Sequence, residues 1–245
     1  MHFESHADVY DQARPPYPAA LWSAIRDLGL MGAGRTAVDL GAGTGQATRP
    51  LLAAGVGVTA VEPGPRLAAR LKAALPAARV VEGRAETVDL PDGGFDFVVA
   101  ATSIHWMDLD VVLPRIHRWL RPDGMLLVWR NVFGDPTAST PFRDRIAQIV
   151  AARRAPARSD IAEEVDAASS ALTRSGLFRV EATHTYRWSV EFDEAQVHRL
   201  FTTFSDWSPE EVGLAASAVA DLGGHVTEHY TSWLVVTRRQ DSASS

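Results

Sequence analysis

The chain has 245 residues, a formal net charge of -6 and no cysteine, and 46% of its residues are hydrophobic. The acidic balance and the lack of a long basic run argue against a nucleic-acid partner, because phosphate backbones are bound by clustered arginine and lysine. The absence of cysteine excludes disulfide scaffolds, thiol nucleophiles and cysteine-ligated zinc. The N-terminus has no basic segment followed by an apolar one, and no apolar run approaches the ~18 residues of a membrane span. We therefore expect a cytoplasmic protein without a membrane partner.

The first 18 residues precede the first predicted helix and contain three prolines near their end. Tyr10 and Arg14 are four residues apart and would share one face if this stretch is helical. The prolines after them favour an extended backbone at the end of this stretch. One interpretation that stays open for this stretch is an amphipathic helix on the edge of the sheet, with Arg14 in a surface ion pair. Residues 18–30 then have the apolar spacing of a helix, which Gly29 closes.

Strands and helices alternate along the next hundred residues. The predicted strands are 36–40, 56–61, 78–82, 95–101 and 124–130, and the predicted helices are 44–54, 64–74 and 108–119. Strands that alternate with helical patterns imply right-handed crossovers and a parallel sheet. The fold class is therefore α/β, and α/β folds of this length are commonly one domain, here over residues 1–245.

The pattern changes after the fifth strand. Residues 140–153, 160–175, 193–204 and 208–222 are predicted to be helical, 178–192 and 226–237 to be strands, and 238–245 to be a flexible tail. The helical stretch is an insertion in the basic plan, so 133–175 and 193–208 are a candidate helical cap over the carboxyl edge of the sheet. Aromatic residues that could line this cap, although each suits an ordinary core as well, are Phe133, Trp188, Phe204 and Trp207.

A glycine turn from Ala37 to Gln46 is the stretch that carries most information about function. It is a short apolar strand that runs into glycines at every second position, 41, 43 and 45, where the missing side chains let a bound molecule approach the backbone. A dinucleotide site would have a third glycine at the position of Gln46. Asp39 would also repel a pyrophosphate, so a nicotinamide-dependent oxidoreductase is disfavoured as a rival function. A tight turn without any ligand is the other alternative.

The residues in and around this turn resemble one family. The phrases VDLGAGTG, AVEP, EGRAE, FDFVVAATSIHW and LRPDGMLLVW are similar in order and spacing to the class I S-adenosylmethionine-dependent methyltransferases. The likeness is greatest to the small-molecule branch, close to the trans-aconitate and ubiquinone-biosynthesis types, and it covers Tyr10 to Asn131 closely. It implies a Rossmann-like, seven-stranded, mostly parallel sheet with helices on both faces. It also implies S-adenosylmethionine, whose sulfonium and ammonium attract a nearby carboxylate.

The resemblance also implies which residues contact the cofactor. Residues 1–18 would form a lid, in which Tyr10 covers the cofactor and Arg14 pairs with its methionine carboxylate. Glu62, which ends the second strand before Pro63, would accept hydrogen bonds from both ribose hydroxyls. The other expected contacts are Asp39, Gly41, Ala42, Gly43, Gly45, Gln46, Pro63, Ala85, Glu86, Ala101, Thr102 and Ser103. Glu86 could instead be a carboxylate at a helix start, facing the local dipole.

The expected acceptor is a small molecule that is methylated on oxygen, a carboxylate or a hydroxyl, by family analogy alone. Methyl transfer from a sulfonium is an in-line displacement, so the protein mainly holds two reactants in line and excludes water. His105 follows the fourth strand, where the acceptor should lie, and an imidazole can take a proton at neutral pH. For His105 and Trp106, three roles stay open: base catalysis, cofactor holding and positioning of an acceptor carboxylate. The candidate acceptor contacts are His105, Trp106, Asn131 and Trp207.

Two further expectations concern function. A homologue that keeps the cofactor pocket but catalyses a reaction other than methylation, or merely binds, is a rival that the glycine turn does not distinguish. The chain is expected to work as a monomer or a homodimer.

One motif resembles a metal site and is rejected. His225, Glu228 and His229 spell H-x-x-E-H, a metalloprotease pattern. Two glycines precede the motif and β-forming residues follow it, so the segment is predicted to be a strand. Four residues of a strand span about 13 Å, which is too far for both histidines to share one zinc ion. We therefore expect no metal site.

Overall fold

The computed structural model describes residues 13–135, 137–153, 165–204 and 206–241. The chain divides into two compact units. Unit 1 comprises Met1–Pro16, Asn131–Asp160 and Arg187–Ser232, and unit 2 comprises Tyr17–Arg130, Ile161–Tyr186 and Trp233–Ser245. Among the described residues, no helix combines the length and the apolar character that a membrane crossing requires.

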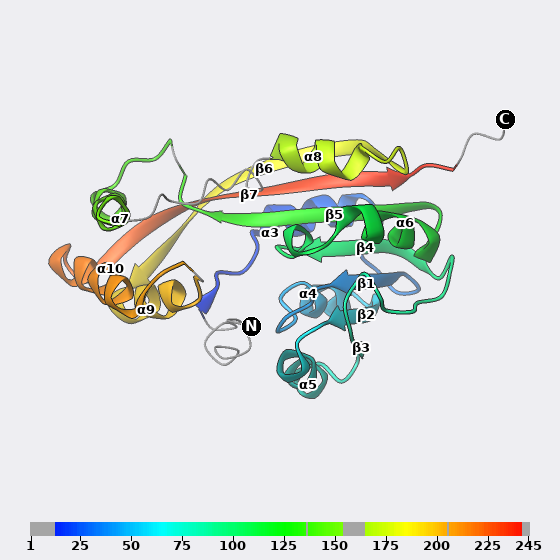
Figure 1. Cartoon of the computed structure of the whole chain (residues 1–245), viewed down its shortest axis with the longest axis horizontal. Helices are drawn as coiled ribbons and strands as arrows, with labels where there is room; N and C mark the ends of the chain where they lie inside the picture. The colour runs from blue at the N-terminus through cyan, green and yellow to red at the C-terminus, as the bar shows by residue number, and fades with distance from the viewer. Residues whose placement is uncertain (1–12, 136, 154–164, 205, 242–245) are drawn as a thin grey trace. The chain divides into compact units, whose positions relative to one another are not determined.

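A seven-stranded sheet organises the fold, in the order β3-β2-β1-β4-β5-β7-β6 (Figure 1). The strands are β1 Thr36–Leu40, β2 Gly57–Glu62, β3 Arg79–Glu82, β4 Phe95–Ala101, β5 Leu120–Phe133, β6 Phe178–Asp193 and β7 His225–Arg239. The pairs β1–β2, β1–β4, β2–β3 and β4–β5 are parallel, whereas β7 runs opposite to its neighbours (Figure 1). The prediction of a seven-stranded, mostly parallel sheet is confirmed.

The strand order indicates where in unit 2 a ligand is expected to bind. β1 lies between β2 and β4, so the winding of the chain reverses after β3. Open α/β sheets bind ligands at such a switch point, beyond the carboxyl ends of the strands. Here β1 ends at Leu40, directly before the glycine turn, and β4 ends at Ala101.

Apolar side chains from helices and strands hold unit 2 together. Its helices are α3 Ala19–Asp27, α4 Thr48–Ala53, α5 Pro65–Ala74, α6 Leu109–Trp119 and α8 Val165–Thr173. Leu21 and Ile25 of α3 are fully buried in the core that also contains Trp129 of β5. Burying such side chains stabilises a fold by roughly 1.5–3 kcal/mol each. Tyr17 joins this core with its ring edge-on to Trp129 at a centroid distance of 5.7 Å.

Unit 1 has a core of its own. Its helices are α7 Pro141–Ala151, α9 Glu194–Thr202 and α10 Pro209–Asp221. Capping boxes begin α9, through Asp193 and Gln196, and α10, through Ser208 and Glu211; each satisfies backbone N–H groups that a helix start leaves without partners. The four aromatics predicted as candidate cap lining all belong to one apolar cluster here, partly buried against residues such as Phe201.

Several element boundaries differ from the sequence prediction. α4 begins at Thr48 and not at residue 44, because Gly45 has a φ of 92°, which a right-handed helix does not allow. β7 continues to Arg239, so the strand includes the first two residues of the predicted tail. α8 falls within the predicted cap range 133–175 but belongs to unit 2, where Arg174 after the helix pairs with Asp110 of α6 at 3.5 Å.

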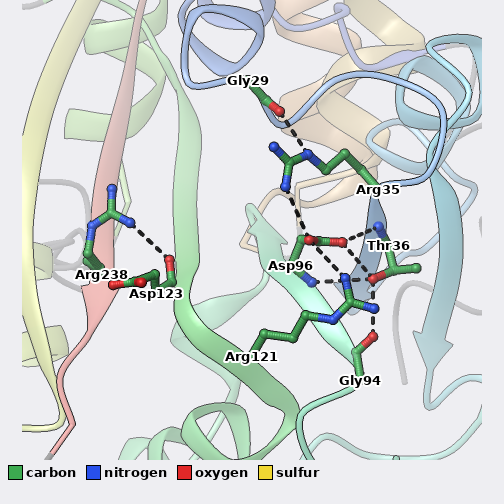
Figure 2. Close-up of polar contacts among 8 residues, drawn as sticks. All are labelled: Gly29, Arg35, Thr36, Gly94, Asp96, Arg121, Asp123 and Arg238. Carbon is green, nitrogen blue, oxygen red and sulfur yellow. Dashed lines mark hydrogen bonds and ion pairs between the residues drawn. The ribbon is translucent and has the colours of Figure 1, made fainter.

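A cluster of charges ties the first residues of β1, β4 and β5 together in unit 2 (Figure 2). The carboxylate of Asp96 accepts hydrogen bonds from the backbone N–H of Thr36 at 2.8 Å, and from the guanidinium groups of Arg35 and Arg121 at 3.2 and 3.0 Å. Burial alone would raise the pKa of Asp96, but the hydrogen bonds from Thr36, the charge of Arg121 and the hydrogen bond from Arg35 hold that pKa below its usual range. This cluster lies at the end of the strands opposite to the glycine turn.

Candidate functional site

The glycine turn after β1 adopts backbone angles that favour glycine. Gly41, Gly43 and Gly45 have φ angles of 68°, 57° and 92°, and side chains rarely tolerate this left-handed region. A Cβ atom on Gly41 would lie 2.7 Å from Cβ of Ser103, and one on Gly45 would lie 2.7 Å from Cδ1 of Leu71. A Cβ on Gly43 would meet nothing within 4 Å. Gly41 and Gly45 are therefore required by packing, whereas the middle glycine faces open space.

Asp39 is fully buried directly before the turn. Its Oδ2 accepts a 2.6 Å hydrogen bond from the hydroxyl of Thr48 in α4. Its Oδ1 is buried without a hydrogen-bond partner among the described residues, as is the hydroxyl oxygen of Thr44 inside the turn. Burial, with a smaller contribution from the charge of Glu62, raises the pKa of Asp39 to about 6. Buried polar atoms of this kind are normally hydrogen-bonded, so they suit a molecule that binds at the turn.

Glu62 ends β2 and is 5% exposed. Its Oε2 accepts a hydrogen bond from the backbone N–H of Gly43 at 2.8 Å, and its Oε1 accepts one from the backbone N–H of Gly64 at 2.8 Å. Each carboxylate oxygen has a further lone pair, so these bonds orient the group without exhausting it. Pro63, the next predicted contact, is exposed, and Gln46 is half-buried.

Ser103, just past the carboxyl end of β4, lies beside the glycine turn. The hydroxyl of Ser103 donates a 2.6 Å hydrogen bond to the carbonyl oxygen of Leu40. Thr102 has a φ of 58°, which is strained for a β-branched residue. Its hydroxyl lies 3.1 Å from that of Tyr17, and its N–H donates to the carbonyl of Trp129 at 2.8 Å. Two contacts thus hold Thr102 in this conformation.

Ala85 and Glu86, two of the expected cofactor contacts, lie after β3. The carboxylate of Glu86 accepts hydrogen bonds from the backbone N–H of Asp108 at 3.1 Å and from Arg84 at 3.3 Å. Burial opposes ionisation of Glu86, but backbone hydrogen bonds and the charge of Arg84 together lower its pKa. The carbonyl of Ala85 accepts from Arg115 at 3.2 Å. Both residues are therefore held by hydrogen bonds within unit 2.

His105 and Trp106 lie in a short 3-10 helix, η1 Ile104–Trp106, just past β4. Both are exposed, Trp106 by 58%. Their ring centroids are 4.8 Å apart and the rings are tilted. A large aromatic side chain on the surface at the ligand edge of the sheet is suited to contact a bound molecule.

The remaining predicted contacts lie in unit 1 or outside the described residues. Tyr10 lies outside them. Arg14 donates to the carbonyl of Thr203 at 3.4 Å, and its guanidinium lies 4.7 Å from the ring centroid of Phe204. The side chain of Asn131 accepts a 2.6 Å hydrogen bond from the hydroxyl of Ser232. Trp207 packs in the aromatic cluster, under the guanidinium of Arg153 at 4.9 Å.

The H-x-x-E-H motif lies on β7, so it is part of a strand as predicted. Glu228 is buried. His229 is partly exposed, and its Nδ1 lies 2.8 Å from the hydroxyl of Ser189. The alternation of burial along β7 puts the glutamate and this histidine on opposite faces of the strand.

Sequence reasoning missed four residues of the site. Thr48 holds Asp39, Gly64 orients Glu62, and Tyr17 holds Thr102. Thr44 has a buried hydroxyl that no other described residue hydrogen-bonds. A hydroxyl at the start of the helix that follows a buried acid is a signal that could have identified Thr48. The contact of Tyr17 with Thr102 spans 85 residues of sequence, and no local pattern indicates it.

The central segment of the chain is similar in sequence to known proteins. Residues 38–128 match the model of a family described as "Methyltransferase domain". Over 132 residues the chain is 42% identical to uncharacterised methyltransferases of Mycobacterium bovis and Mycobacterium tuberculosis, a match of 54% of this chain and 53% of theirs. A methyltransferase-like protein of Schizosaccharomyces pombe is 30% identical over 159 residues, 64% of this chain and 60% of that protein. The chain spans about half the length of the curated relatives it matches.

Solved structures share the fold at low sequence identity. A Haemonchus contortus phosphoethanolamine N-methyltransferase, in complex with phosphomonomethylethanolamine and S-adenosylhomocysteine, has a TM-score of 0.57 and 16% identity, over 97% of this chain and 58% of that one. A geranyl diphosphate methyltransferase, in complex with its diphosphate and sinefungin, has a TM-score of 0.52 and 17% identity, over 91% and 77%. Residues 38–128 of this chain are therefore similar to a methyltransferase domain, and the chain has a Rossmann-like fold that solved methyltransferases share.

Proposed function

We propose that the chain transfers the methyl group of S-adenosylmethionine to an oxygen of a small-molecule acceptor. The observation that carries this proposal is the pair of buried carboxylates, Asp39 and Glu62, beside the glycine turn. Asp39 keeps one buried oxygen without a partner among the described residues, and Gly43 leaves room over its Cα. Two acids favour a ligand with a sulfonium and an ammonium, and they disfavour a pyrophosphate.

The residues of unit 2 fit this cofactor. The backbone from Gly41 to Gly43 would approach its methionyl part, and Asp39 would accept a hydrogen bond from its ammonium. Glu62, already oriented by two backbone amides, would accept from the ribose hydroxyls. Ala85 and Glu86 would contact the adenine edge, and the residues after β4 would supply carbonyl oxygens near the ammonium.

When bound, S-adenosylmethionine supplies an activated methyl group, so the chain has to bind, orient and exclude water. We assign His105 and Trp106 to the acceptor, because they are exposed at the end of β4. Asn131 and Trp207 are assigned to the acceptor as well. The lid of residues 1–18, with Tyr10 and Arg14, the candidate helical cap and the trans-aconitate or ubiquinone-biosynthesis branch remain part of the proposal. So do a cytoplasmic location and a monomer or homodimer that binds no nucleic acid.

The proposal is tested by turnover. Purified protein is incubated with S-adenosylmethionine carrying a labelled methyl group and with pools of small carboxylic acids, phenols and aliphatic alcohols. We expect S-adenosylhomocysteine to form, and label to appear in the product, in at least one oxygen-acceptor pool. Label transfer only to amine acceptors would contradict the oxygen assignment. Binding of S-adenosylhomocysteine without transfer to any pool would favour the non-methylating homologue, and failure of both cofactor forms to bind would contradict the cofactor assignment.

A further inference from the structure

Thr102, directly after β4, has a backbone conformation that its side chain disfavours. Its φ is 58°, and this left-handed region crowds a β-branched side chain. A threonine leaves this region unless its surroundings hold it there, and residues held in this way concentrate at ligand sites. Thr102 lies at such a place, beyond the carboxyl end of a central strand of unit 2.

The conformation of Thr102 determines where the next residue lies. Ser103 is buried, and its hydroxyl donates a 2.6 Å hydrogen bond to the carbonyl of Leu40, the last residue of β1. A Cβ atom on Gly41 would lie 2.7 Å from Cβ of Ser103, so the serine packs against the first glycine of the turn. Rotation about φ of Thr102 would move Ser103 away from both residues. It would also turn η1, which begins one residue later.

Two hydrogen bonds hold Thr102, one on each side of the bond about which φ rotates. On one side, its backbone N–H donates to the carbonyl of Trp129 at 2.8 Å. On the other side, its hydroxyl oxygen lies 3.1 Å from the hydroxyl oxygen of Tyr17, and either group can donate. The bond to Trp129 fixes the N–H but leaves rotation about N–Cα free. The contact with Tyr17 therefore supplies the restraint on φ.

The hydroxyl of Tyr17 is itself held in place by aromatic packing in unit 2. The side chain is 8% exposed. Its ring meets that of Trp129 edge-on at a centroid distance of 5.7 Å and that of Trp22 at 6.2 Å. Edge-to-face contacts of this kind are favourable and orient the ring. The same tryptophan thus contacts the ring of Tyr17 and binds the N–H of Thr102, so both restraints on Thr102 come from one rigid group.

We propose that Tyr17 is a positioning residue of the cofactor site and that its hydroxyl holds Thr102 in the left-handed conformation. Thr102 in turn keeps Ser103 against Leu40 and the glycine turn. This inference rests on the proposed function, in which the turn binds S-adenosylmethionine. Tyr17 acts through Thr102 and not by contact with the cofactor. A turn that is already ordered binds its ligand without a further cost in entropy.

The first test is Tyr17→Phe, which keeps the packed ring and removes only the hydroxyl. We expect its affinity for S-adenosylhomocysteine, measured by isothermal titration, to fall roughly 3- to 10-fold, the size of one neutral hydrogen bond. The matched control is Tyr186→Phe. Tyr186 packs against the same core of unit 2, and its hydroxyl is buried without a hydrogen-bond partner among the described residues. Equal affinity of the two variants would overturn the inference.

A second test compares alanine and glycine at position 102. Both lack the hydroxyl that Tyr17 contacts, but only glycine adopts a φ near 58° without strain. Thr102→Gly should therefore bind S-adenosylhomocysteine at least about threefold more tightly than Thr102→Ala. Equal affinities would show that the hydroxyl acts in some way other than through the backbone, and would overturn the inference.

The double variant tests whether Tyr17 acts through Thr102. In the Thr102→Gly background, Tyr17→Phe should change affinity by less than about twofold, because the contact is already gone. A loss as large as in the wild-type background would overturn the inference.

Urea denaturation of the same samples separates positioning from a general loss of structure. We expect Tyr17→Phe to be fully folded under the titration conditions. A loss of affinity that only follows the folded fraction across the variants would overturn the inference. If wild-type protein does not bind S-adenosylhomocysteine, the proposed function fails and the inference fails with it. If wild-type protein binds and the variants do not differ, only the inference fails.

Discussion

The carboxylate of Glu62, at the end of β2, accepts a 2.8 Å hydrogen bond from the backbone N–H of Gly43, in the turn that follows β1. The side chain of Glu62 therefore ties the turn after β1 to the neighbouring strand β2, and the carboxylate is itself held in a single orientation. A group held in this way can bind a ligand without first being ordered, which reduces the entropic cost of binding.

Replacing Glu62 by glutamine should weaken the binding of S-adenosylhomocysteine. An amide nitrogen would face the N–H of Gly43 or of Gly64, so one existing hydrogen bond is lost together with an acceptor for the ribose. We expect a loss of about 1–3 kcal/mol, or roughly 10- to 100-fold in affinity by isothermal titration. The control is Glu82→Gln, the exposed residue opposite Glu62 in the β2–β3 register. Equal affinity of both variants would refute the ribose assignment.

Alanine at two positions of the turn should separate folding from binding. Gly45→Ala brings a Cβ within 2.7 Å of Leu71 and Leu75, so its main effect should be a free energy of unfolding lower by roughly 1–3 kcal/mol. Gly43→Ala meets no neighbour and carries only the backbone cost of about 1–2 kcal/mol, but it should reduce cofactor affinity more than Gly45→Ala does. The measurements are chemical denaturation and titration. A larger binding loss in Gly45→Ala would argue against a ligand over Gly43.

Replacing His105 by alanine should reduce turnover and spare the cofactor. His105 is exposed at the end of β4, so we expect affinity for S-adenosylhomocysteine to change by no more than about twofold. If the imidazole takes the acceptor's proton, kcat should fall by about 100-fold or more. His198→Ala, on the exposed side of α9, serves as the control. Parallel losses of affinity and turnover would mark His105 as a cofactor contact.

The Asp96 cluster makes stability depend on pH in a defined direction (Figure 2). The pKa of Asp96 is lowered in the folded state, so its contribution is fully present above the ordinary aspartate pKa and is lost as the pH falls through the folded value. Asp96→Asn should therefore reduce the free energy of unfolding at pH 7, on the order of 1 kcal/mol, and the difference from wild type should shrink below pH of about 4. Urea denaturation across this range measures it. Asp92→Asn, whose side chain is 68% exposed, should show neither effect; a constant difference at all pH values would contradict the interpretation.

The sequence was sufficient to predict those elements whose pattern is local. Alternating apolar strands and helices predict β1 to β5, and glycines at every second position predict the turn and its backbone. The same information could not place the start of α4, because apolar spacing does not reveal the φ of 92° at Gly45. The spacing of apolar residues predicts that residues 44–47 belong to the helix.

Contacts over long sequence distances were beyond prediction. The hydroxyl of Tyr17 lies 3.1 Å from that of Thr102, 85 residues away, and no local pattern indicates this contact. Glu228 was considered only as part of the H-x-x-E-H motif. Its Oε1 lies 3.6 Å from Nε of Arg143, 85 residues away, and its Oε2 has no hydrogen-bond partner among the described residues; no local pattern indicates either.

The most direct test of the account is a pair of titrations of the purified chain, one with S-adenosylhomocysteine and one with NADH, each repeated with Glu62→Gln. The account predicts that S-adenosylhomocysteine binds with one site per chain and more weakly to the variant, and that NADH does not bind. Binding of NADH, or affinity for S-adenosylhomocysteine that is the same in both proteins, would contradict it.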